Sequence, residues 1–528
     1  MNVPTLIESL SPPGAYPHPV DAVEVHQTHI SVVFLAGPFA YKIKKPVNLG
    51  FVDFSTLEKR RHFCDEEVRL NRRLAPHVYL GVVPITMAEE HPRFDGAGPA
   101  IEWAVKMKRL PSDATLEHHL ERGDVTSEHL RALAARLANF HRHAESNERI
   151  SSFGRFDVVA ANARENFAQT ATHVGRTVSA AVYERVRELN ETHLTTLYDL
   201  IDARASRGVP RDTHGDLHLD HVYLFPENPP NDLVIVDCIE FADRFRFADP
   251  VADMAFLAMD LTFHGRRDLA RIFADAYFEA VGDAEGRRLF AFYMAYRALV
   301  RGKVEGIELD EPEVADAERL QAQERARAHW LLALGELETP ANRPALVLMA
   351  GLPGSGKSTL AHSLAQSANF SVLRSDVIRK ELAGVSASVA PADFETGIYG
   401  DAWTERTYAE LHQRAEQRLW QGERVMIDAN FRDDQRRQPF FDAARRWGVP
   451  VLFIHCKAAP EVTRARLQAR KHDASDADLR IYECLRQTWQ PVTAEWQRRA
   501  FPLDASGSLA ENEQQLQSIL RQEGLLAS

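Results

Sequence analysis

Cysteine, long apolar runs and an excess of basic charge are all missing from this sequence. Its 528 residues include only four cysteines, far apart and never paired as CxxC, so neither a disulfide framework nor a cysteine zinc site is predicted and a reducing compartment is expected. No run of eighteen apolar residues occurs, which argues against a membrane span or a membrane partner. The first residues lack a basic segment followed by an apolar one, so we expect no export signal and a cytoplasmic location.

The charge balance is acidic. Asp and Glu number 75 against 63 Lys and Arg, giving a formal net charge of −12. A dedicated nucleic-acid binder normally carries a basic surface, so the balance argues against nucleic acid as a partner, although a local basic groove stays open. The hydrophobic content of 45% and the charged content of 26% are globular values and exclude a mostly disordered chain. At this length we expect two to four domains.

A division of the chain is visible near its middle. A charged, Ala-rich stretch with helical spacing covers residues 306–338, and Pro340 and Pro344 then prevent helix continuation. An apolar, strand-like run follows directly. We therefore predict an N-terminal domain of residues 1–335, a linker of residues 336–344 and a C-terminal domain of residues 345–528.

The start of the C-terminal half, ALVLMAGLPGSGKST, contains a complete phosphate-binding loop pattern. Glycines after an apolar strand let backbone N–H groups curl around phosphate oxygens, and the following helix points its positive end at the same charge. Lys357 would reach the β and γ phosphates and Ser358 would hold Mg²⁺, so ATP and Mg²⁺ are the predicted cofactors. The predicted nucleotide-binding residues are Gly351, Pro353, Gly354, Ser355, Gly356, Lys357, Ser358 and Thr359.

Two carboxylates follow strands of this half. Further apolar strands occur at the spacing of a parallel sheet with helical crossovers, at residues 370–374, 424–428, 451–456 and 500–503. Asp428 ends one strand and is a candidate ligand for Mg²⁺ or its waters. Asp376 follows another, at the edge where ligands of open sheets bind, and could accept a proton from an acceptor hydroxyl. It could also cap the helix that it begins, and both roles can hold.

Arginines cluster near the end of this half, in APEVTRARLQARKHDASDA. Their spacing places Arg466 and Arg470 on one helix face, where they could neutralise charge on a transferring phosphoryl group. A solvated basic helix is the alternative.

Taken together, GLPGSGKST, SDVIRKEL, RVMIDANF and RARLQARKHDASDA resemble the small P-loop kinases, a group that includes gluconate kinase and chloramphenicol phosphotransferase. The resemblance covers almost all of residues 345–528. It implies a five-stranded parallel sheet, a short lid that carries arginines, and transfer of the γ-phosphoryl group to a hydroxyl. The loop itself specifies nucleotide binding and leaves the acceptor open.

The N-terminal half carries its clearest signal in THGDLHLDHVYLF and the following LVIVDCIEF. Asp216 lies in a short loop before an apolar stretch, and Asp237 follows an apolar strand, a layout suited to a base and a Mg²⁺ ligand. The pattern resembles the aminoglycoside phosphotransferase and protein-kinase-like fold, with a small lobe of about residues 1–107 and a large lobe of about 108–335. The resemblance implies that Asp216 is the catalytic base, Asp237 the metal ligand and Asp253 a buried support.

One residue departs from that family pattern. The family has a metal-binding Asn five residues after the base, whereas this sequence has His221. Mg²⁺ prefers hard oxygen ligands, so imidazole is a poor replacement. Asp220, one residue earlier, is an alternative oxygen ligand that would require a changed backbone.

Upstream, HISVVFLAGPFAYKIKKPV reads as a β-hairpin whose second strand places Ala40, Lys42 and Lys44 on one face. The resemblance implies that one of these lysines, by preference Lys42, holds the nucleotide phosphates. It also implies that Glu67, in the helix-like run that follows, pairs with this lysine.

The whole order resembles a bacterial two-part family described as bifunctional aminoglycoside phosphotransferase-like and ATP-binding proteins. It implies an α+β protein-kinase-like domain joined to an α/β P-loop kinase domain. Our leading hypothesis is an ATP-dependent phosphotransferase acting on a small-molecule hydroxyl, with its clearest site in the C-terminal half.

Two alternatives stay open. In one, the protein is a nucleotide-dependent switch or scaffold whose N-terminal half binds a ligand without chemistry; His221 favours this reading, whereas Asp216 and Asp237 favour chemistry. In the other, the C-terminal half phosphorylates nucleic-acid ends, but no aromatic series is interleaved with its arginines. The acceptor, the oligomeric state and any coupling between the sites are not defined by the sequence.

Overall fold

The computed structural model describes residues 2–50, 52–88, 91–227, 232–311, 314–384, 397–469 and 479–527. The chain forms two compact units. The first comprises Met1–Ala161, Leu197–Thr262 and Arg266–Tyr293; the second comprises Asn162–Thr196, Phe263–Gly265 and Met294–Ser528. Among the described residues, no helix is long and apolar enough to cross a bilayer.

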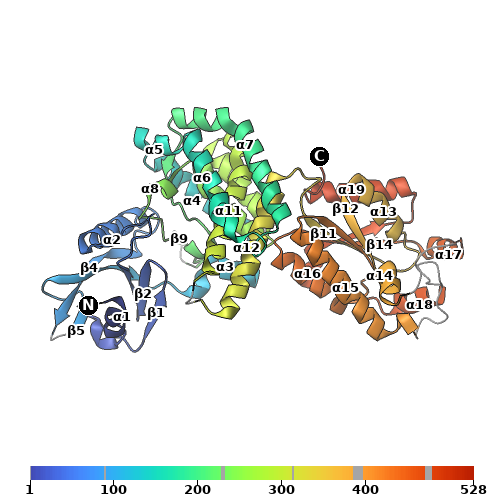
Figure 1. Cartoon of the computed structure of the whole chain (residues 1–528), viewed down its shortest axis with the longest axis horizontal. Helices are drawn as coiled ribbons and strands as arrows, with labels where there is room; N and C mark the ends of the chain where they lie inside the picture. The colour runs from blue at the N-terminus through green and yellow to red at the C-terminus, as the bar shows by residue number, and fades with distance from the viewer. Residues whose placement is uncertain are drawn as a thin grey trace. The chain divides into compact units, whose positions relative to one another are not determined.

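The first unit begins with a six-stranded antiparallel sheet in the order β1-β2-β3-β6-β4-β5 (Figure 1). Helix α1 (Val3–Leu10) covers part of the sheet and buries Leu6 and Leu10 in a core with Phe34, Tyr41 and Phe94. Helix α2 (Leu57–Asn71) packs on β6 and β4. The strands are β1 (Val23–Gln27), β2 (Ser31–Ala36), β3 (Phe39–Lys44), β4 (Tyr79–Ala88), β5 (His91–Phe94) and β6 (Ala100–Lys108).

The predicted hairpin is present as β2 and β3, whose last cross-strand pair is Ala36 and Phe39. Gly37 and Pro38 form the two-residue loop between the strands. Gly37 has φ +57, a left-handed conformation that glycine adopts without a Cβ penalty, so the tight turn is possible here.

The rest of the first unit is mostly helical. It contains α3 (Leu116–Arg122), α4 (Ser127–His143), α5 (Glu148–Phe153), α8 (Asp243–Arg246) and α10 (Arg267–Val281), and α4 packs along α10. Helix α9 (Pro250–Phe263) is apolar on nearly every side and is buried along almost its whole length. Two short antiparallel ladders carry the candidate loops: β7 (Arg211–Asp212) with β10 (Phe247–Ala248), and β8 (Val222–Leu224) with β9 (Leu233–Ile235).

The second unit is built on the expected five-stranded parallel sheet, in the order β12-β13-β11-β14-β15. This confirms the predicted strands, because each apolar run of the sequence is a strand of this sheet. Strand β11, which comes first along the chain in this sheet, lies in its centre, so the phosphate-binding loop that follows it emerges from the middle of the sheet's carboxyl edge. The strands are β11 (Ala345–Ala350), β12 (Phe370–Arg374), β13 (Arg424–Asp428), β14 (Val451–Lys457) and β15 (Ala500–Asp504).

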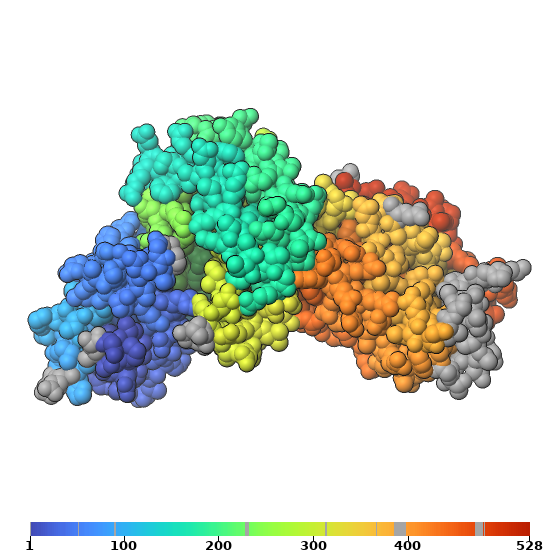
Figure 2. Space-filling view, in the orientation of Figure 1, coloured from blue at the N-terminus to red at the C-terminus, as the bar shows by residue number. Residues whose placement is uncertain are grey.

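Both faces of this sheet are covered, which explains why β11 is apolar and buried at all six positions. On one face, Val347 and Met349 share a core with α13 (Lys357–Ser367) and α19 (Leu509–Gln522). Helices α15 (Asp401–Trp420) and α16 (Asp434–Arg446) pack on each other and form the orange surface turned to the viewer in Figure 2. Shorter helices at the carboxyl edge are α14 (Ser375–Leu382), α17 (Pro460–Ala469) and α18 (Leu479–Gln487).

The second unit also includes helices that precede the expected linker. They are parts of α6 (Phe156–Thr170), α7 (Ala180–Ser206) and α11 (Phe290–Glu308), together with α12 (Asp316–Leu337). Trp330 of α12 is fully buried and its ring lies 5.9 Å from that of Phe167 and 5.7 Å from that of Tyr183. The domain boundaries expected from the sequence, at residues 335 and 345, stay a prediction.

Candidate active site

The loop after β11 has the backbone that the sequence pattern predicts. Gly351, Gly354 and Gly356 all have positive φ, at +150, +77 and +90. Space is also restricted, since a Cβ on Gly351 would lie 2.6 Å from the carbonyl oxygen of Cys456. Helix α13 begins at Lys357 directly after the loop, so its unpaired N–H groups and positive end face the loop. The loop can therefore hold an anion such as a phosphate group.

A carboxylate lies beside this loop. Asp428 ends β13, is buried, and is paired in register with Met349 of the neighbouring β11. Its Oδ2 lies 3.3 Å from Nε of Arg374, whereas its Oδ1 accepts no hydrogen bond from any described residue. A buried carboxylate oxygen without a donor favours a cation. With the hydroxyl of Ser358 in the first turn of α13, the donor set consists of oxygens and fits Mg²⁺.

A cavity of about 410 Å³ opens next to the loop. Asp376 lies in the first turn of α14 and lines it, as does Lys357. The residue at the N-cap of α14 is Arg374, so Asp376 does not occupy the capping position. The charged residues that line the cavity are Lys357, Asp376, Arg379, Asp401, Arg432 and Arg436.

The arginines of the cavity differ from those singled out in the sequence. Arg466 of α17 contacts the loop, with Nη1 3.4 Å from the carbonyl oxygen of Ser355, and Arg470 falls outside the described residues. Arg379, Arg432 and Arg436 were not identified from the sequence. The available signal was position, because Arg432 follows Asp428 at the carboxyl end of β13.

Several contacts fix the cavity wall. Arg379 donates to the carbonyl of Ile398 at 2.8 Å and to Thr404 Oγ1 at 3.2 Å, and burial lowers its pKa. The Tyr408 hydroxyl donates to Asn430 Oδ1 at 3.0 Å and accepts from the backbone N–H of Phe431. Burial raises the pKa of Tyr408 to about 12, so it stays a neutral donor.

The first unit holds a second group of charged residues. Nζ of Lys42 lies 2.7 Å from Asp237 Oδ1 and 3.0 Å from Glu67 Oε1, and the buried Lys44 lies 2.7 Å from Glu67 Oε2 and also contacts Glu240. Burial alone would lower the pKa of Lys42, but Asp237 and then Glu67 raise it well above its ordinary value. The structure thus brings together Lys42, Glu67 and Asp237, and adds Lys44 as a second partner of Glu67.

The Asp216 loop is held by buried polar contacts. The Asp253 carboxylate accepts the backbone N–H of His214 at 3.1 Å and that of Gly215 at 2.8 Å, and it lies 3.0 Å from His141 Nε2. A Cβ on Gly215, which has φ +88, would lie 2.9 Å from the carbonyl oxygen of Phe245. Asp253 therefore fixes the backbone just before Asp216. The sequence resemblance implies such a supporting role for Asp253.

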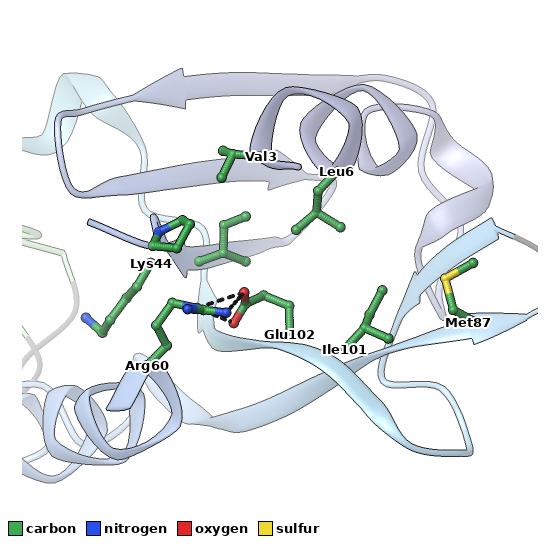
Figure 3. A pocket seen from close by; sticks show the side chains of 9 residues that line it. Val3, Leu6, Lys44, Arg60, Met87, Ile101 and Glu102 are labelled. Carbon is green, nitrogen blue, oxygen red and sulfur yellow. Dashed lines mark hydrogen bonds and ion pairs between the residues drawn. The ribbon is translucent and has the colours of Figure 1, made fainter. Parts of the chain in front are cut away.

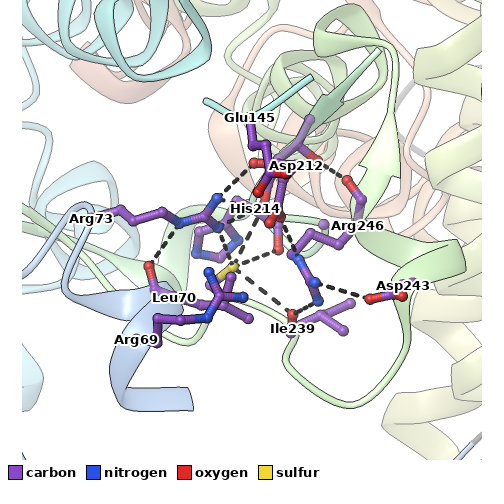
Figure 4. A network of polar contacts seen from close by, with 12 residues as sticks. Arg69, Leu70, Arg73, Glu145, Asp212, His214, Ile239, Asp243 and Arg246 are labelled. Atoms are coloured by element: carbon purple, nitrogen blue, oxygen red, sulfur yellow. Dashed lines mark hydrogen bonds and ion pairs between the residues drawn. The ribbon is translucent and has the colours of Figure 1, made fainter. Parts of the chain in front are cut away.

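A wider network anchors the same loop (Figure 4). Arg73, in the turn after α2, donates to the carbonyl of Asp212 at 2.7 Å and to that of Thr213 at 3.1 Å. Arg246 pairs with the Asp212 carboxylate and donates to the carbonyl of Ile239 at 2.8 Å. Both arginines therefore hold the loop in place against neighbouring segments of the first unit.

The metal-ligand set of the first unit does not fit Mg²⁺. His218 and His221 lie beside Asp216, and Nε2 of His221 lies 3.6 Å from Asp237 Oδ2. Mg²⁺ requires oxygen ligands in octahedral geometry, whereas two of these side chains offer imidazole nitrogen. Asp220 does not simply replace the missing Asn, because burial, followed by Glu117, raises its pKa to about 7.

A further cavity of about 380 Å³ lies on the sheet of the first unit (Figure 3). Val3, Leu6 and Ile101 form its apolar wall. The ion pair of Arg60 with Glu102, at 2.8 Å, forms a polar wall.

The chain is similar to known proteins over most of its length and, in a separate comparison, over part of its second unit. A protein-family model described as an AAA domain matches residues 346–492. Two mycobacterial proteins, "Uncharacterized protein Rv2004c" of Mycobacterium tuberculosis and "Uncharacterized protein Mb2027c" of Mycobacterium bovis, are each 34% identical over 475 residues, which cover 89% of this chain and 91% of the relative. The chain belongs to the family of these mycobacterial proteins.

Two solved structures are similar to about a third of this chain. A gluconokinase from Sinorhizobium meliloti 1021 is 18% identical, covers 34% of the chain and 93% of its own, and has a TM-score of 0.26. A sugar kinase from Janibacter sp. HTCC2649 is also 18% identical, covers 35% of the chain and 99% of its own, and has a TM-score of 0.27.

Proposed function

We propose that the second unit is an ATP-dependent kinase that transfers the γ-phosphoryl group of ATP to the hydroxyl group of a small molecule. The observation that carries this proposal is that Lys357 and Asp376 line one cavity. Lys357 begins the helix after the phosphate-binding loop, and Asp376 is a carboxylate on another helix at the same edge of the sheet. The cavity thus joins a phosphate-binding group to a proton acceptor, as phosphoryl transfer requires.

Each residue has a defined role in this proposal. The loop amides and Lys357 hold the β and γ phosphates, and Arg466, which contacts the loop from α17, adds positive charge beside them. Mg²⁺ on Ser358 and Asp428 would neutralise charge on the phosphate oxygens. Asp376 accepts the proton of the acceptor hydroxyl while the hydroxyl oxygen bonds to the γ-phosphorus. The bond from that phosphorus to the bridging oxygen of ADP breaks at the same time, and ADP leaves.

The acceptor is proposed to carry a negative group in addition to its hydroxyl. The cavity is lined by four cationic and two acidic side chains. Arg432 and Arg436 contact the carboxylates of Asp433 and Glu405. The hydrogen bonds of Arg379, in contrast, go to two uncharged oxygens, those of Ile398 and Thr404, so Arg379 adds positive charge to the cavity wall. A carboxylate or phosphate on the acceptor would balance that charge.

A screen of the full-length protein tests both statements. Mg·ATP is incubated with anionic and neutral hydroxy compounds of matched size, ADP release is measured, and the product is identified by mass spectrometry. We expect phosphorylation of anionic acceptors that is abolished in Lys357→Ala and retained in the control Lys457→Ala, since Lys457 is exposed at the end of β14. Undiminished phosphorylation by Lys357→Ala would exclude the proposed site, and a preference for neutral acceptors would exclude only the anionic class.

A second candidate function concerns the first unit. Lys42, Glu67 and Asp237 form a contiguous ion-pair group, an arrangement that supports a kinase-like nucleotide site. We propose that this unit binds nucleotide or another phosphate ligand. The candidate metal ligands of the first unit do not fit Mg²⁺. The geometry therefore favours a switch or scaffold role for this unit over a second phosphoryl transfer.

Calorimetric titration of a non-hydrolysable ATP analogue with Mg²⁺ tests this second proposal. Two sites in the full-length protein, of which one is lost in Lys42→Ala and the other in Lys357→Ala, would support it. A single site that persists in Lys42→Ala would contradict it.

A further inference from the structure

Within the described residues, Asp216, His218 and His221 form a cluster whose ligand atoms all lie within 4.8 Å of one another. All three come from one short segment, in which the turn Leu219–His221 brings His218 and His221 together with their ring centroids 3.9 Å apart. Asp237, after β9, adds a fourth potential ligand, with Oδ2 3.6 Å from His221 Nε2. Two imidazoles and two carboxylates therefore converge on one place.

The orientation of His221 is fixed by its other nitrogen. Nδ1 lies 2.8 Å from the backbone carbonyl oxygen of Asp216, which only accepts hydrogen bonds, so Nδ1 carries the hydrogen. A neutral ring then has its lone pair on Nε2, the atom that faces Asp237. Two acceptors facing each other are stabilised by a cation between them. Metal-binding histidines commonly donate their second ring N–H to a carbonyl in this way.

The spacings agree with a coordination sphere. Nε2 of His221 and Oδ2 of Asp237 are 3.6 Å apart, and Nε2 of His218 and Oδ2 of Asp216 are 3.5 Å apart. Both distances are longer than a hydrogen bond. Two ligands that each lie about 2.1 Å from a tetrahedral metal ion are separated by about 3.4 Å. These two spacings match ligand pairs around one ion, and the ligand atoms of Asp216, His218 and His221, which lie within 4.8 Å of one another, would move closer together when the ion binds.

We propose that Asp216, His218, His221 and Asp237 bind a divalent transition-metal ion of the zinc type instead of Mg²⁺. Imidazole nitrogen with carboxylate oxygen is a common donor set for Zn²⁺, whereas Mg²⁺ disfavours nitrogen ligands. Lys42 contacts the other oxygen of Asp237 and leaves Oδ2 for the ion. With the metal bound, Asp216 is a ligand and is not available as a general base, so the site binds a ligand through the metal without acting as a Mg²⁺-dependent kinase.

The test uses the full-length protein without a histidine tag, in a Cys484→Ser background that removes the exposed thiol. The protein is treated with chelator and desalted, Zn²⁺ alone is added without nucleotide, and affinity is measured by competition with a chromophoric chelator. We expect one tightly bound Zn²⁺ per chain that millimolar Mg²⁺ does not displace. His221→Asn and His218→Asn should each lower Zn²⁺ affinity at least tenfold, whereas His26→Asn, at an exposed position of β1, should leave it unchanged.

Circular dichroism checks that each variant is folded, and Co²⁺ replaces Zn²⁺ in the parent protein as a probe that needs no variant. Intense visible bands of four-coordinate Co²⁺ are expected. Weak bands typical of a six-coordinate oxygen environment would overturn the proposal. So would equal Zn²⁺ affinity in the parent and in folded His221→Asn and His218→Asn proteins.

Discussion

Gly354→Ala should weaken nucleotide binding to the second unit without unfolding the protein. Gly354 has φ +77, and a Cβ there would lie 2.9 Å from Cγ2 and 3.1 Å from the carbonyl oxygen of Thr463, and 3.0 Å from Cγ of Leu467. A left-handed residue with a Cβ costs about 1–2 kcal/mol, and overpacking a filled site costs a further 1–3 kcal/mol. Because Thr463 and Leu467 lie on helix α17, the loop must shift away from its phosphate-binding geometry.

A matched control separates the two contributions. Gly123 ends α3 with φ +78, and a Cβ there meets open space, so Gly123→Ala carries the backbone cost alone. If the substitution at Gly354 weakens the binding free energy of Mg·ATP by about 1.4 kcal/mol, Kd rises tenfold. We expect at least that rise in Gly354→Ala and none in Gly123→Ala, measured calorimetrically at the site that Lys357→Ala removes. Wild-type affinity in folded Gly354→Ala would refute this account of the loop.

Three further outcomes follow from the same structure. Asp376→Asn should lower kcat by about 10²–10⁴ with little change in KM for ATP, because it removes the proposed base and no phosphate contact; an equal loss in kcat and in nucleotide affinity would argue against that role. Lys44→Met should destabilise the protein by about 3–5 kcal/mol in urea unfolding, because it leaves Glu67 and Glu240 buried with one cation fewer, and a loss below 1 kcal/mol would contradict it. Burial, followed by nearby cations, lowers the pKa of His455 to about 4. As the pH falls, the unfolded chain therefore binds a proton at His455 near pH 6.5, before the folded chain does. The free energy of unfolding should fall as the pH is lowered from 6.5 to 4, and less steeply in His455→Gln.

The second unit could be predicted well because its signals are local. Each strand is a mostly apolar run, and Asp428 is the last residue of one of them, so its place at the carboxyl edge of the sheet follows from the sequence. The cavity wall could not be predicted in this way. Arg379, Arg432 and Arg436 come from α14, from a loop after β13 and from α16, and the crossover connections decide that they meet.

The first unit shows a different limit. Strand alternation places Lys42 and Lys44 on one face, but it cannot say which of them pairs with Glu67. The structure uses both, because the two carboxylate oxygens of Glu67 each contact one lysine. Similarly, the spacing of His218 and His221 does not reveal that a single turn brings their rings together, so the histidine cluster is visible only in three dimensions.

The measurement that tests the account most directly is a calorimetric titration of a non-hydrolysable ATP analogue with Mg²⁺ into wild type and Lys357→Ala, with Lys457→Ala as the control. The proposed kinase activity requires that the loop of residues 351–359 is a nucleotide site. It predicts that Lys357→Ala loses one binding site that wild type and Lys457→Ala both retain. An unchanged number of sites and unchanged affinities in Lys357→Ala would contradict it.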